Sequence, residues 1–483
     1  MDAAHDDLDV ALDILGQQPL LQIYTQFTLV FAVPDESRHE QIVQALSDGL
    51  GRAAASFPWI AGQVVNEGAG EGSTGVFKIK KLAPAPLLVV KDLRRDDEVS
   101  SMKDFADAGF PMKMLDEKLL AYRMTLPGNI DGPREVLSVQ ADFIRGGLLL
   151  TFTAAHNTVD AVGQAEMMVL ISKACRGDNF TADELKIGNM RRDNLVPLLD
   201  ESYKPGPELA DQVLGLGGAP PPPPAAPGPG PAPVCSWVYF DFTAESLAEI
   251  KTMASGTIPA GSPVRFVSTD DALSAFVWKS VARARLPRLL SEAASTDALE
   301  VKLTRAIDVR PHLDLPPTYP GLMQTLNYHR HDLRRLAEAP LGVLAADLRA
   351  PLLPPSPRAS SSSADDAQPA WDLARLARAI MTYVAQTPDL SGVSFTATVD
   401  PASDLMLSSW AKLGPALYGL DFGLGLGMPV AVRRPRFNPF EGLAYLMPRA
   451  PDGGIALAVS LRDEDLERLR ADVDFAKFAV FVG

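Results

Sequence analysis

The stretch Leu148-Leu-Leu-Thr-Phe-Thr-Ala-Ala-His-Asn-Thr-Val-Asp160 ends an apolar, β-branched run on a histidine and places an aspartate four residues later. The segment Ala161-Val-Gly-Gln-Ala-Glu-Met-Met-Val-Leu-Ile171 continues with a helical pattern, which Asp160 is suited to cap. Of the six histidines, only His156 ends a run hydrophobic enough to be a core strand. Catalytic residues concentrate where a strand runs into a loop, so this position predicts a role in proton transfer.

Strands and helices alternate on both sides of this stretch. It belongs to a predicted hairpin of 137–144 and 148–155 around the turn Arg145-Gly-Gly147. Upstream, we expect a strand at 22–34 and a helix capped by Ser37. Downstream, the expected strands and helices are 234–243, 245–254, a helix from a Thr269 cap to Arg285, 301–308, 393–399, 455–461 and 463–470. The alternation predicts a mixed α/β fold in both halves.

A chain of 483 residues is long enough for two domains, each with its own core. Residues 215–233 are almost wholly proline, glycine and alanine, which predicts an extended linker. The linker would join an N-terminal domain of residues 1–214 to a C-terminal domain of residues 234–483. A second low-complexity segment at 351–370, which contains a serine run, is expected to be a surface insert in the second domain.

The net charge of −15 argues against a nucleic acid or an anionic membrane surface as a partner. No apolar run approaches the ~18 residues that a membrane-spanning helix requires. The first residues are acidic where a secretory signal would be basic and then apolar, so we expect a cytoplasmic protein. Two cysteines are too few for a disulfide framework.

Several chemistries are compatible with one motif and not with the whole chain. A metal pair of His156 and Asp160 would need a third ligand, and no other cluster has suitable spacing. A serine hydrolase would need a Gly-x-Ser-x-Gly elbow, which is absent from the sequence. Asp421-Phe-Gly423 lacks the other kinase motifs, and Gly423-Leu-Gly-Leu-Gly427 lacks dinucleotide spacing. A buried histidine that only hydrogen-bonds a loop stays open at this point.

The motifs His156-Asn-Thr-Val-Asp160 and Asp421-Phe-Gly-Leu-Gly425 together resemble those of the BAHD-type acyl-CoA-dependent acyltransferases. The resemblance is closer to the fungal branch, which includes the trichothecene 3-O-acetyltransferases. Further landmarks occur in the same order, from about Phe27 to the C-terminus: Phe57-Pro-Trp-Ile-Ala-Gly62, Ser268-Thr-Asp-Asp-Ala-Leu-Ser-Ala-Phe-Val-Trp278, Asp308-Val-Arg310, Tyr319-Pro-Gly321 and Ser408-Ser-Trp410. Each motif alone is weak, but together and in order they are specific.

Some positions depart from the plant members of the family. Leu424 stands where plant members have tryptophan, as is common in the fungal branch. The glycine that often follows the motif aspartate is Ala161 here, with Gly163 two residues on. Leu322 follows Tyr319-Pro-Gly321 in place of asparagine. Substrates of plant enzymes are therefore a poor guide, whereas the histidine is retained.

The resemblance implies two chloramphenicol-acetyltransferase-like domains, with mixed sheets flanked by helices and an active-site channel between the domains. It implies that His156 is the general base and that Asp160 points away from the channel to pair with Arg310, which orients the loop. Gly163 and the turn of Asp421, Gly423 and Gly425 would be structural.

Acyl-CoA would be a cosubstrate, with no permanently bound cofactor and no metal. The basic run Arg433, Arg434 and Arg436 is a candidate for contacts to the CoA phosphates, although a solvated loop is an equally good interpretation. Ser408 and Ser409 are candidate oxyanion donors.

The expected function is transfer of an acyl group, most simply acetyl, from CoA to a hydroxyl of a small secondary metabolite by direct attack in a ternary complex. A monomer is expected. Two alternatives stay open: an amine acceptor on the same fold, and a relative that binds a metabolite without catalysis. The sequence specifies neither the acceptor nor the acyl chain length.

Overall fold

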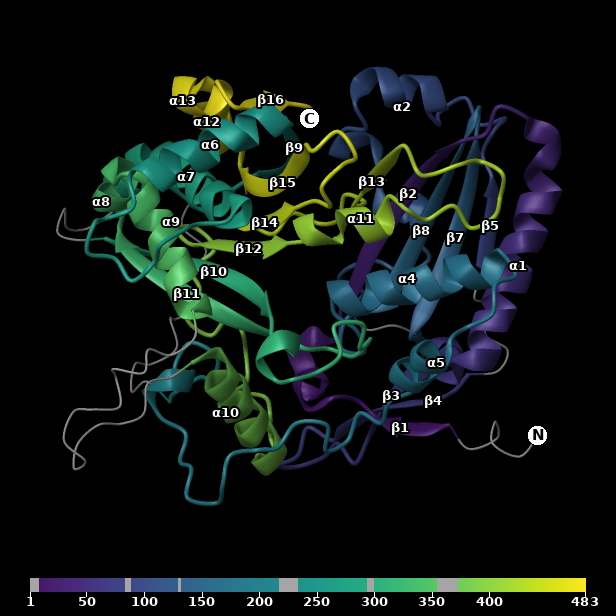
Figure 1. The fold of residues 1–483 in the computed structure, drawn as a ribbon, viewed down its shortest axis with the longest axis horizontal. Coiled ribbons are helices and arrows are strands. Elements are labelled where there is room, and N and C mark those ends of the chain that lie inside the picture. Colours follow the sequence, from purple (N-terminus) through teal and green to yellow (C-terminus); the bar gives the residue numbers. More distant parts are fainter. Residues whose placement is uncertain (1–7, 83–87, 129–131, 217–232, 293–298, 354–371) are drawn as a thin grey trace.

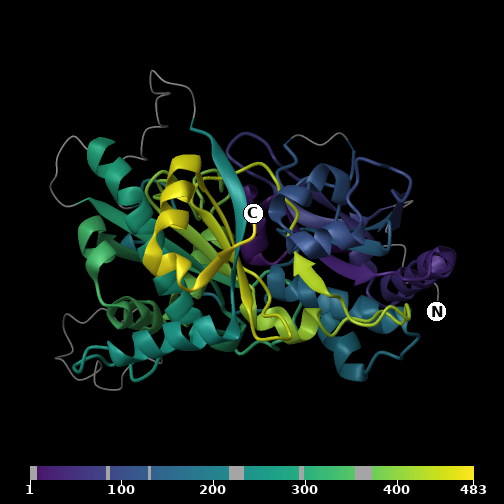
Figure 2. The ribbon, with the colours of Figure 1, turned by 90° about the horizontal axis from the view of Figure 1, so that it is seen from above.

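The computed structural model describes residues 8–82, 88–128, 132–216, 233–292, 299–353 and 372–483 (Figure 1). Apart from their outermost residues, the predicted linker at 215–233 and the predicted insert at 351–370 lie outside these ranges. Over the described ranges, no helix has the length and apolar character needed to cross a membrane. The fold is mixed α/β, with two large sheets side by side and helices against each (Figures 1 and 2).

The N-terminal half is built on a five-stranded sheet. In spatial order its strands are β13 (Ala431–Arg433), β2 (Tyr24–Ala32), β8 (Gly147–Ala155), β7 (Leu137–Ile144) and β5 (Leu88–Asp92). The predicted hairpin is confirmed as β7 and β8, with Ile144 opposite Gly147. Two helices, α1 (His39–Ser56) and α4 (Ala161–Cys175), pack against each other and lie beside this sheet (Figure 1). All residues of β7 and β8 are buried, which explains their nearly continuous apolar character.

Shorter elements complete this half of the molecule. A four-stranded sheet has the order β1 (Asp9–Ala11), β4 (Val76–Lys81), β3 (Gly62–Glu67) and β6 (Arg134–Glu135). The helices are α2 (Met102–Ala108), α3 (Glu117–Leu120) and α5 (Ala182–Gly188). Strand β13 belongs to the five-stranded sheet of the N-terminal half, although its residues lie near the end of the sequence.

The C-terminal half contains a seven-stranded sheet. Its order is β11 (Gln324–Asp332), β10 (Glu300–Asp308), β12 (Leu405–Ser409), β14 (Leu443–Leu446), β15 (Ile455–Arg462), β9 (Cys235–Phe242) and β16 (Ala479–Phe481). The sheet is mixed, because β12 runs parallel to both β10 and β14 while the other pairs are antiparallel. The helices of this half are α6 (Ala244–Gly256), α7 (Thr269–Glu292), α8 (Leu333–Glu338), α9 (Leu341–Arg349), α10 (Leu373–Gln386), α11 (Gly414–Leu417), α12 (Asp463–Ala471) and α13 (Val473–Ala476).

A segment of the C-terminal half crosses to the N-terminal sheet. Strand β13 pairs antiparallel with β2, with Ala431 opposite Val30. Figure 2 shows this yellow-green segment extending over the lobe that the N-terminal residues form. Trp410, Phe422 and Trp237 belong to the same buried apolar cluster as the N-terminal strands. The division predicted at 215–233 does not anticipate this shared core.

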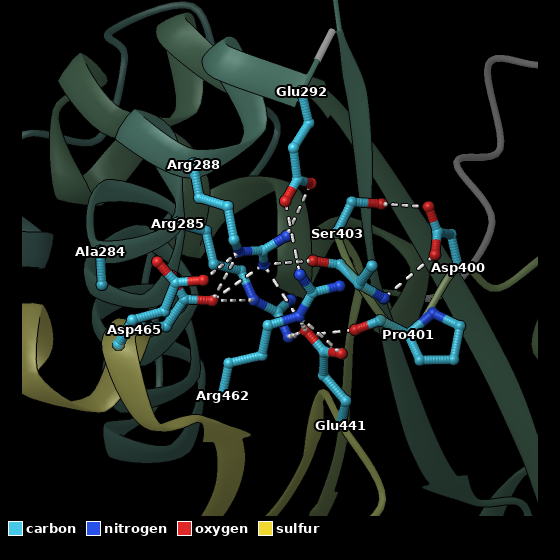
Figure 3. Close-up of polar contacts among 12 residues, drawn as sticks. Ala284, Arg285, Arg288, Glu292, Asp400, Pro401, Ser403, Glu441, Arg462 and Asp465 are labelled. Atoms are coloured by element: carbon cyan, nitrogen blue, oxygen red, sulfur yellow. Dashed lines mark hydrogen bonds and ion pairs between the residues drawn. The ribbon is translucent and has the colours of Figure 1, made fainter. Parts of the chain in front are cut away.

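Buried charges connect the helices of the C-terminal half to its sheet (Figure 3). Arg288 of α7 donates from Nε and Nη2 to Asp465 Oδ2 of α12, at 3.1 and 2.8 Å. Arg285 donates to the carbonyl of Asp404 at 2.7 Å, and Arg462 of β15 donates to Glu441 at 2.9 Å. Burial lowers the pKa of Arg285 to about 10, so the guanidinium still carries its charge at neutral pH.

Four local predictions need correction. Residues 393–399 form turns instead of a strand, and within them only Val393 makes a bridge, to Val213. Val393, Ala397 and Val399 are buried, and Val393 belongs to a third core cluster, so the apolar pattern of the run reflects burial and not sheet pairing. Asp35, and not Ser37, caps the turn before α1, while the cap of α7 is the pair of Ser268 and Asp271. Helix α7 also continues past Arg285 to Glu292.

Candidate active site

His156 lies in the short loop between β8 and α4. Its backbone N–H donates to the carbonyl of Ile23 at 2.8 Å, which ties the loop to the residue before β2. The hydroxyl of Thr158 donates to the carbonyl of Ala155 at 2.7 Å and closes the turn. A rigid sheet on one side and the first turn of α4 on the other therefore fix the position of the histidine.

The two ring nitrogens of His156 have different environments. Nδ1 lies 3.0 Å from the carbonyl oxygen of Val159, which can only accept a hydrogen bond. This contact assigns the proton to Nδ1 and leaves Nε2 with a free lone pair. Burial is the main cause that lowers the pKa of His156 below 6.5, and the charge of Arg434 acts in the same direction, against that of Asp160. The ring is therefore neutral at pH 7 and able to accept a proton.

Asp160 is directed away from His156 and pairs with Arg310, as predicted. Its two oxygens accept from Arg310 Nη1 and Nη2 at 2.9 and 3.0 Å, and both side chains are buried. Two backbone groups complete its coordination: Gly163 N at 2.9 Å, which caps α4, and Met323 N at 2.8 Å. The carboxylate thus holds the loop, the helix and a segment of the C-terminal half together.

Arg310 extends this connection into the C-terminal half. It donates to the carbonyls of Tyr319 and Gly321 at 2.9 and 2.6 Å and to Asp308 at 3.0 Å. Its carboxylate partners raise its pKa despite its burial. A Cβ at Gly163 would overlap the carbonyl of Pro320, so glycine lets α4 approach this segment closely.

Sequence reasoning missed a second buried ion pair behind the loop. Arg192 donates from Nη1 to Asp13 at 2.9 Å and to the carbonyl of Thr158 at 2.6 Å. Asp13 also accepts from the hydroxyl of Tyr319 and from Leu322 N. Neither Asp13 nor Arg192 belongs to a recognisable motif, and the contact joins positions 179 residues apart, so the sequence offered no signal for it.

His156 faces a cavity of about 360 Å³ between the two large sheets. The walls come from both halves of the chain and are mainly apolar: Leu15, Leu20, Leu21, Ile23, Tyr24, Leu126, Ala161, Ala306, Leu322, Leu326, Phe395, Met406, Leu407, Trp410, Phe437, Phe440, Leu443 and Tyr445. The polar lining is Gln18, Thr25, Thr125, Gln212, Thr304, Gln324, Thr325, Thr396, Ser408 and Arg434. An apolar cavity with a few polar groups and one imidazole suits a small organic ligand.

The segment from Asp421 to Gly425 does not line this cavity. Asp421 Oδ1 accepts from Gly423 N at 3.2 Å and from Arg176 at 3.3 Å, which fixes a tight turn. Phe422 has a φ of 52° and is fully buried against the aromatic rings of the N-terminal sheet. Gly423 and Gly425 have φ values of 65° and 66°, where residues with a Cβ are strained. The motif docks one half of the chain onto the other.

The three candidate arginines lie in different environments. Arg433 lies over the ring of Tyr239 at 5.1 Å, outside the cavity lining. Arg436 is paired with Asp116 at 2.7 Å and lines a separate cavity of about 440 Å³. Arg434 alone of the three lines the cavity of His156. The three arginines therefore do not line one common cavity, and their contact to CoA phosphates stays a prediction.

The two serines of β12 also diverge. Ser408 lines the cavity, and its oxygen accepts a hydrogen bond from Trp410 Nε1 at 3.1 Å, so its own proton is not used in that contact. The hydroxyl of Ser409 donates to Asp270. Across the residues that the structure describes, no group of three or more His, Cys, Asp or Glu side chains is arranged to hold a metal ion.

Residues 23–175 match the model of the trichothecene 3-O-acetyltransferase-like N-terminal domain. The chain is 50% identical over 479 residues to O-acetyltransferase dmxR13 of Cryptosporiopsis sp., covering 99% of this chain and 98% of that protein. It is 46% identical to trichothecene 3-O-acetyltransferase TRI101 of Fusarium sporotrichioides, covering 98% of this chain and 97% of the relative.

Solved structures agree with these sequence relationships. The F. sporotrichioides TRI101 complex with coenzyme A and T-2 has a TM-score of 0.87 and 43% identity, covering 99% of this chain and all of the other. The F. graminearum TRI101 complex with coenzyme A and deoxynivalenol has a TM-score of 0.88 and 41% identity, with the same coverage. Vinorine synthase, 17% identical with a TM-score of 0.61, shares the fold. The chain therefore belongs to the trichothecene 3-O-acetyltransferase-like family of fungal acyltransferases.

Proposed function

We propose that this protein transfers an acetyl group from acetyl-CoA to a hydroxyl of an apolar small-molecule secondary metabolite, with His156 as the general base. The observation that carries the proposal is the free Nε2 of His156, which faces a cavity built from both halves of the chain. The relatives described above are named O-acetyltransferases, and solved TRI101 structures contain coenzyme A. CoA is accordingly proposed as a cosubstrate that is released in every cycle.

The reaction follows from the state of the imidazole. The acceptor hydroxyl donates to Nε2, which takes its proton as the oxygen attacks the thioester carbonyl. The hydrogen bond from Nδ1 to Val159 keeps the ring in the tautomer that accepts at Nε2. Collapse of the tetrahedral intermediate breaks the C–S bond, and the imidazolium returns its proton to the sulfur to give free CoA. Asp160, engaged by Arg310, orients the loop and takes no proton.

The cavity supports an apolar alcohol as the acceptor. Among the described residues, its walls hold no carboxylate, which a protonated amine would require as a partner. We also propose that the enzyme acts as a monomer, which light scattering during gel filtration can test. The assay determines the acceptor, the chain length of the acyl group and the hydroxyl that is acylated.

The test measures CoA release by the full-length protein with acetyl-CoA and matched panels of apolar alcohols and amines. We expect release that depends on an alcohol, and a loss of about 10²–10⁴-fold in His156→Ala, the usual contribution of a general base. His312→Gln changes a histidine outside the cavity lining and should retain wild-type turnover.

Near-normal turnover by His156→Ala would exclude the mechanism. Transfer to amines alone would make the protein an N-acyltransferase. No release with any acceptor would point to a relative that binds a metabolite without catalysis.

A further inference from the structure

Arg434 is a buried cation held by aromatic rings. The residue is 2% exposed and follows β13 directly. Its guanidinium carbon lies 4.6, 4.9 and 5.7 Å from the ring centroids of Phe437, Tyr445 and Trp410. Nη2 lies 3.3 Å from the hydroxyl oxygen of Thr125, and Nε has no hydrogen-bond partner among the described residues. Aromatic faces stabilise a cation without neutralising its charge.

Arg434 differs from the other buried arginines in having no acidic partner. Each of the others lies within 4 Å of a carboxylate: Arg192, Arg285, Arg288, Arg305 and Arg310. Within the described residues, no such ion pair involves Arg434. The buried Glu117 is instead engaged by Gln26 Nε2 at 3.0 Å and by Thr125 N at 2.6 Å. An unpaired buried charge is costly, which indicates that a ligand supplies the missing negative charge.

The guanidinium and the imidazole share one region of the cavity. Thr125, which contacts Arg434, accepts from Tyr24 N at 3.0 Å through its carbonyl. His156 N donates to the carbonyl of the preceding residue, Ile23. The adjacent residues Ile23 and Tyr24 therefore hold the backbone of His156 and of Thr125, the residue that contacts Arg434. The side chains of His156 and Arg434 both line the cavity. Negative charge that develops next to His156 is exposed to the field of Arg434.

We propose that Arg434 stabilises the oxyanion that forms on the thioester carbonyl during acyl transfer. The inference rests on the proposed function. As the acceptor oxygen bonds to the carbonyl carbon, the carbonyl π electrons move to oxygen, and a positive charge already in place stabilises them without reorganisation. When the C–S bond breaks, the electrons return to re-form the carbonyl and the sulfur leaves with its bonding pair. Only the transition state and the intermediate carry this extra charge, so the effect appears in kcat.

The alternative negative partner of Arg434 is a phosphate of CoA. An acyl donor without phosphates distinguishes this partner from the oxyanion. S-acetylpantetheine keeps the thioester and lacks every phosphate. Arg434→Met fills the aromatic cage without a charge, and Arg434→Lys keeps the charge in a different shape. We expect Arg434→Met to lose about 10²–10³-fold in kcat with both donors, the usual effect of removing an oxyanion donor, and Arg434→Lys to lose less.

The pH profile supplies a second readout. Asp160 and Arg434 act on His156 in opposite directions, while Tyr24 and Tyr445, the tyrosines of the cavity wall, have pKa values raised by burial and stay neutral. Removing the positive charge should therefore raise the pKa of His156. The acidic limb of kcat/KM moves to higher pH in Arg434→Met, and the titration of the His156 ring followed by NMR moves in the same direction.

Two outcomes would overturn the inference. A rise in KM for acetyl-CoA combined with wild-type kinetics on S-acetylpantetheine would assign Arg434 to a CoA phosphate. Unchanged kcat and an unshifted His156 titration in a folded Arg434→Met protein would show that Arg434 does not stabilise the oxyanion. Arg470→Met, which removes a guanidinium 3.9 Å from the ring of Phe481 on the surface, is the matched control and should behave as wild type. Failure of the proposed function is distinct, because the wild type itself would then release no CoA.

Discussion

At the scale of single residues, the histidine and the aspartate of the motif have separate tasks. His156 keeps Nε2 free for the cavity, whereas Asp160 accepts its hydrogen bonds from Arg310, from Gly163 N and from Met323 N. A carboxylate that accepts four charged or backbone hydrogen bonds stabilises the fold chiefly by compensating the buried guanidinium. Asp160 therefore influences catalysis by positioning the loop.

Asp160→Asn should destabilise the protein by about 3–5 kcal/mol, because it leaves the guanidinium of Arg310 buried without its main counter-charge. Urea unfolding at pH 7 measures the loss. Asp193→Asn removes a carboxylate that pairs with Arg191 on the surface, and it should cost far less because solvent screens an exposed ion pair. Equal losses in the two variants would show that the buried pair has no special importance.

At the scale of the elements, the first turn of α4 is the joint between the two halves. Asp160 caps this helix, and Gly163 brings its backbone against the carbonyl of Pro320. Sequence periodicity predicted the helix and its cap. It did not predict which element the helix would approach, because the partner segment lies more than 150 residues away.

Gly163→Ala should lower the free energy of unfolding by about 1–3 kcal/mol and reduce turnover, because the new Cβ forces α4 away from Pro320. Gly51→Ala is the matched helical control: Gly51 lies in α1, where a Cβ would meet no atom within 4 Å. Since alanine favours a helix, that change should stabilise the protein by about 0.5–1 kcal/mol. Chemical denaturation and CoA release measure both variants, and stabilisation by Gly163→Ala would contradict the close packing.

At the scale of the whole molecule, residues of the C-terminal half complete the apolar core of the N-terminal half. The segment after β12 carries Trp410, Phe422 and β13 into the N-terminal half. Phe422 packs on Phe31 and Phe152 with ring centroids 6.2 and 5.7 Å apart. Because Trp410 and Phe422 of the C-terminal half are part of this core, the N-terminal half does not keep it intact when the C-terminal half unfolds.

Phe422→Ala should destabilise the whole protein by about 3–5 kcal/mol, since it empties a fully buried aromatic site between the halves. Calorimetry should show a single transition at a lower temperature, in the variant as in the wild type. Phe266→Ala, at a residue that is 57% exposed, should leave the transition temperature nearly unchanged. Two resolved transitions in the wild type would mean that the halves unfold independently.

Local patterns were sufficient wherever one element determines the outcome. The strand and helix periods around His156 predicted β7 and β8 within a residue and the start of α4, because side-chain burial on one face follows directly from the backbone repeat. The motif resemblance also led to the Asp160–Arg310 pair. The strand predicted at 393–399 was wrong, since burial of apolar residues outside a sheet imitates the pattern of a strand.

By itself, the sequence determined the mixed α/β fold, the family and the position of one histidine at the end of a buried strand. Only the tertiary structure decided that Arg434, among three neighbouring arginines, lines the cavity, and that Asp13 and Arg192 lie behind the loop. The physical reason is that charge and burial at a site are sums over neighbours from distant parts of the chain. Those neighbours become defined only when the two sheets pack together.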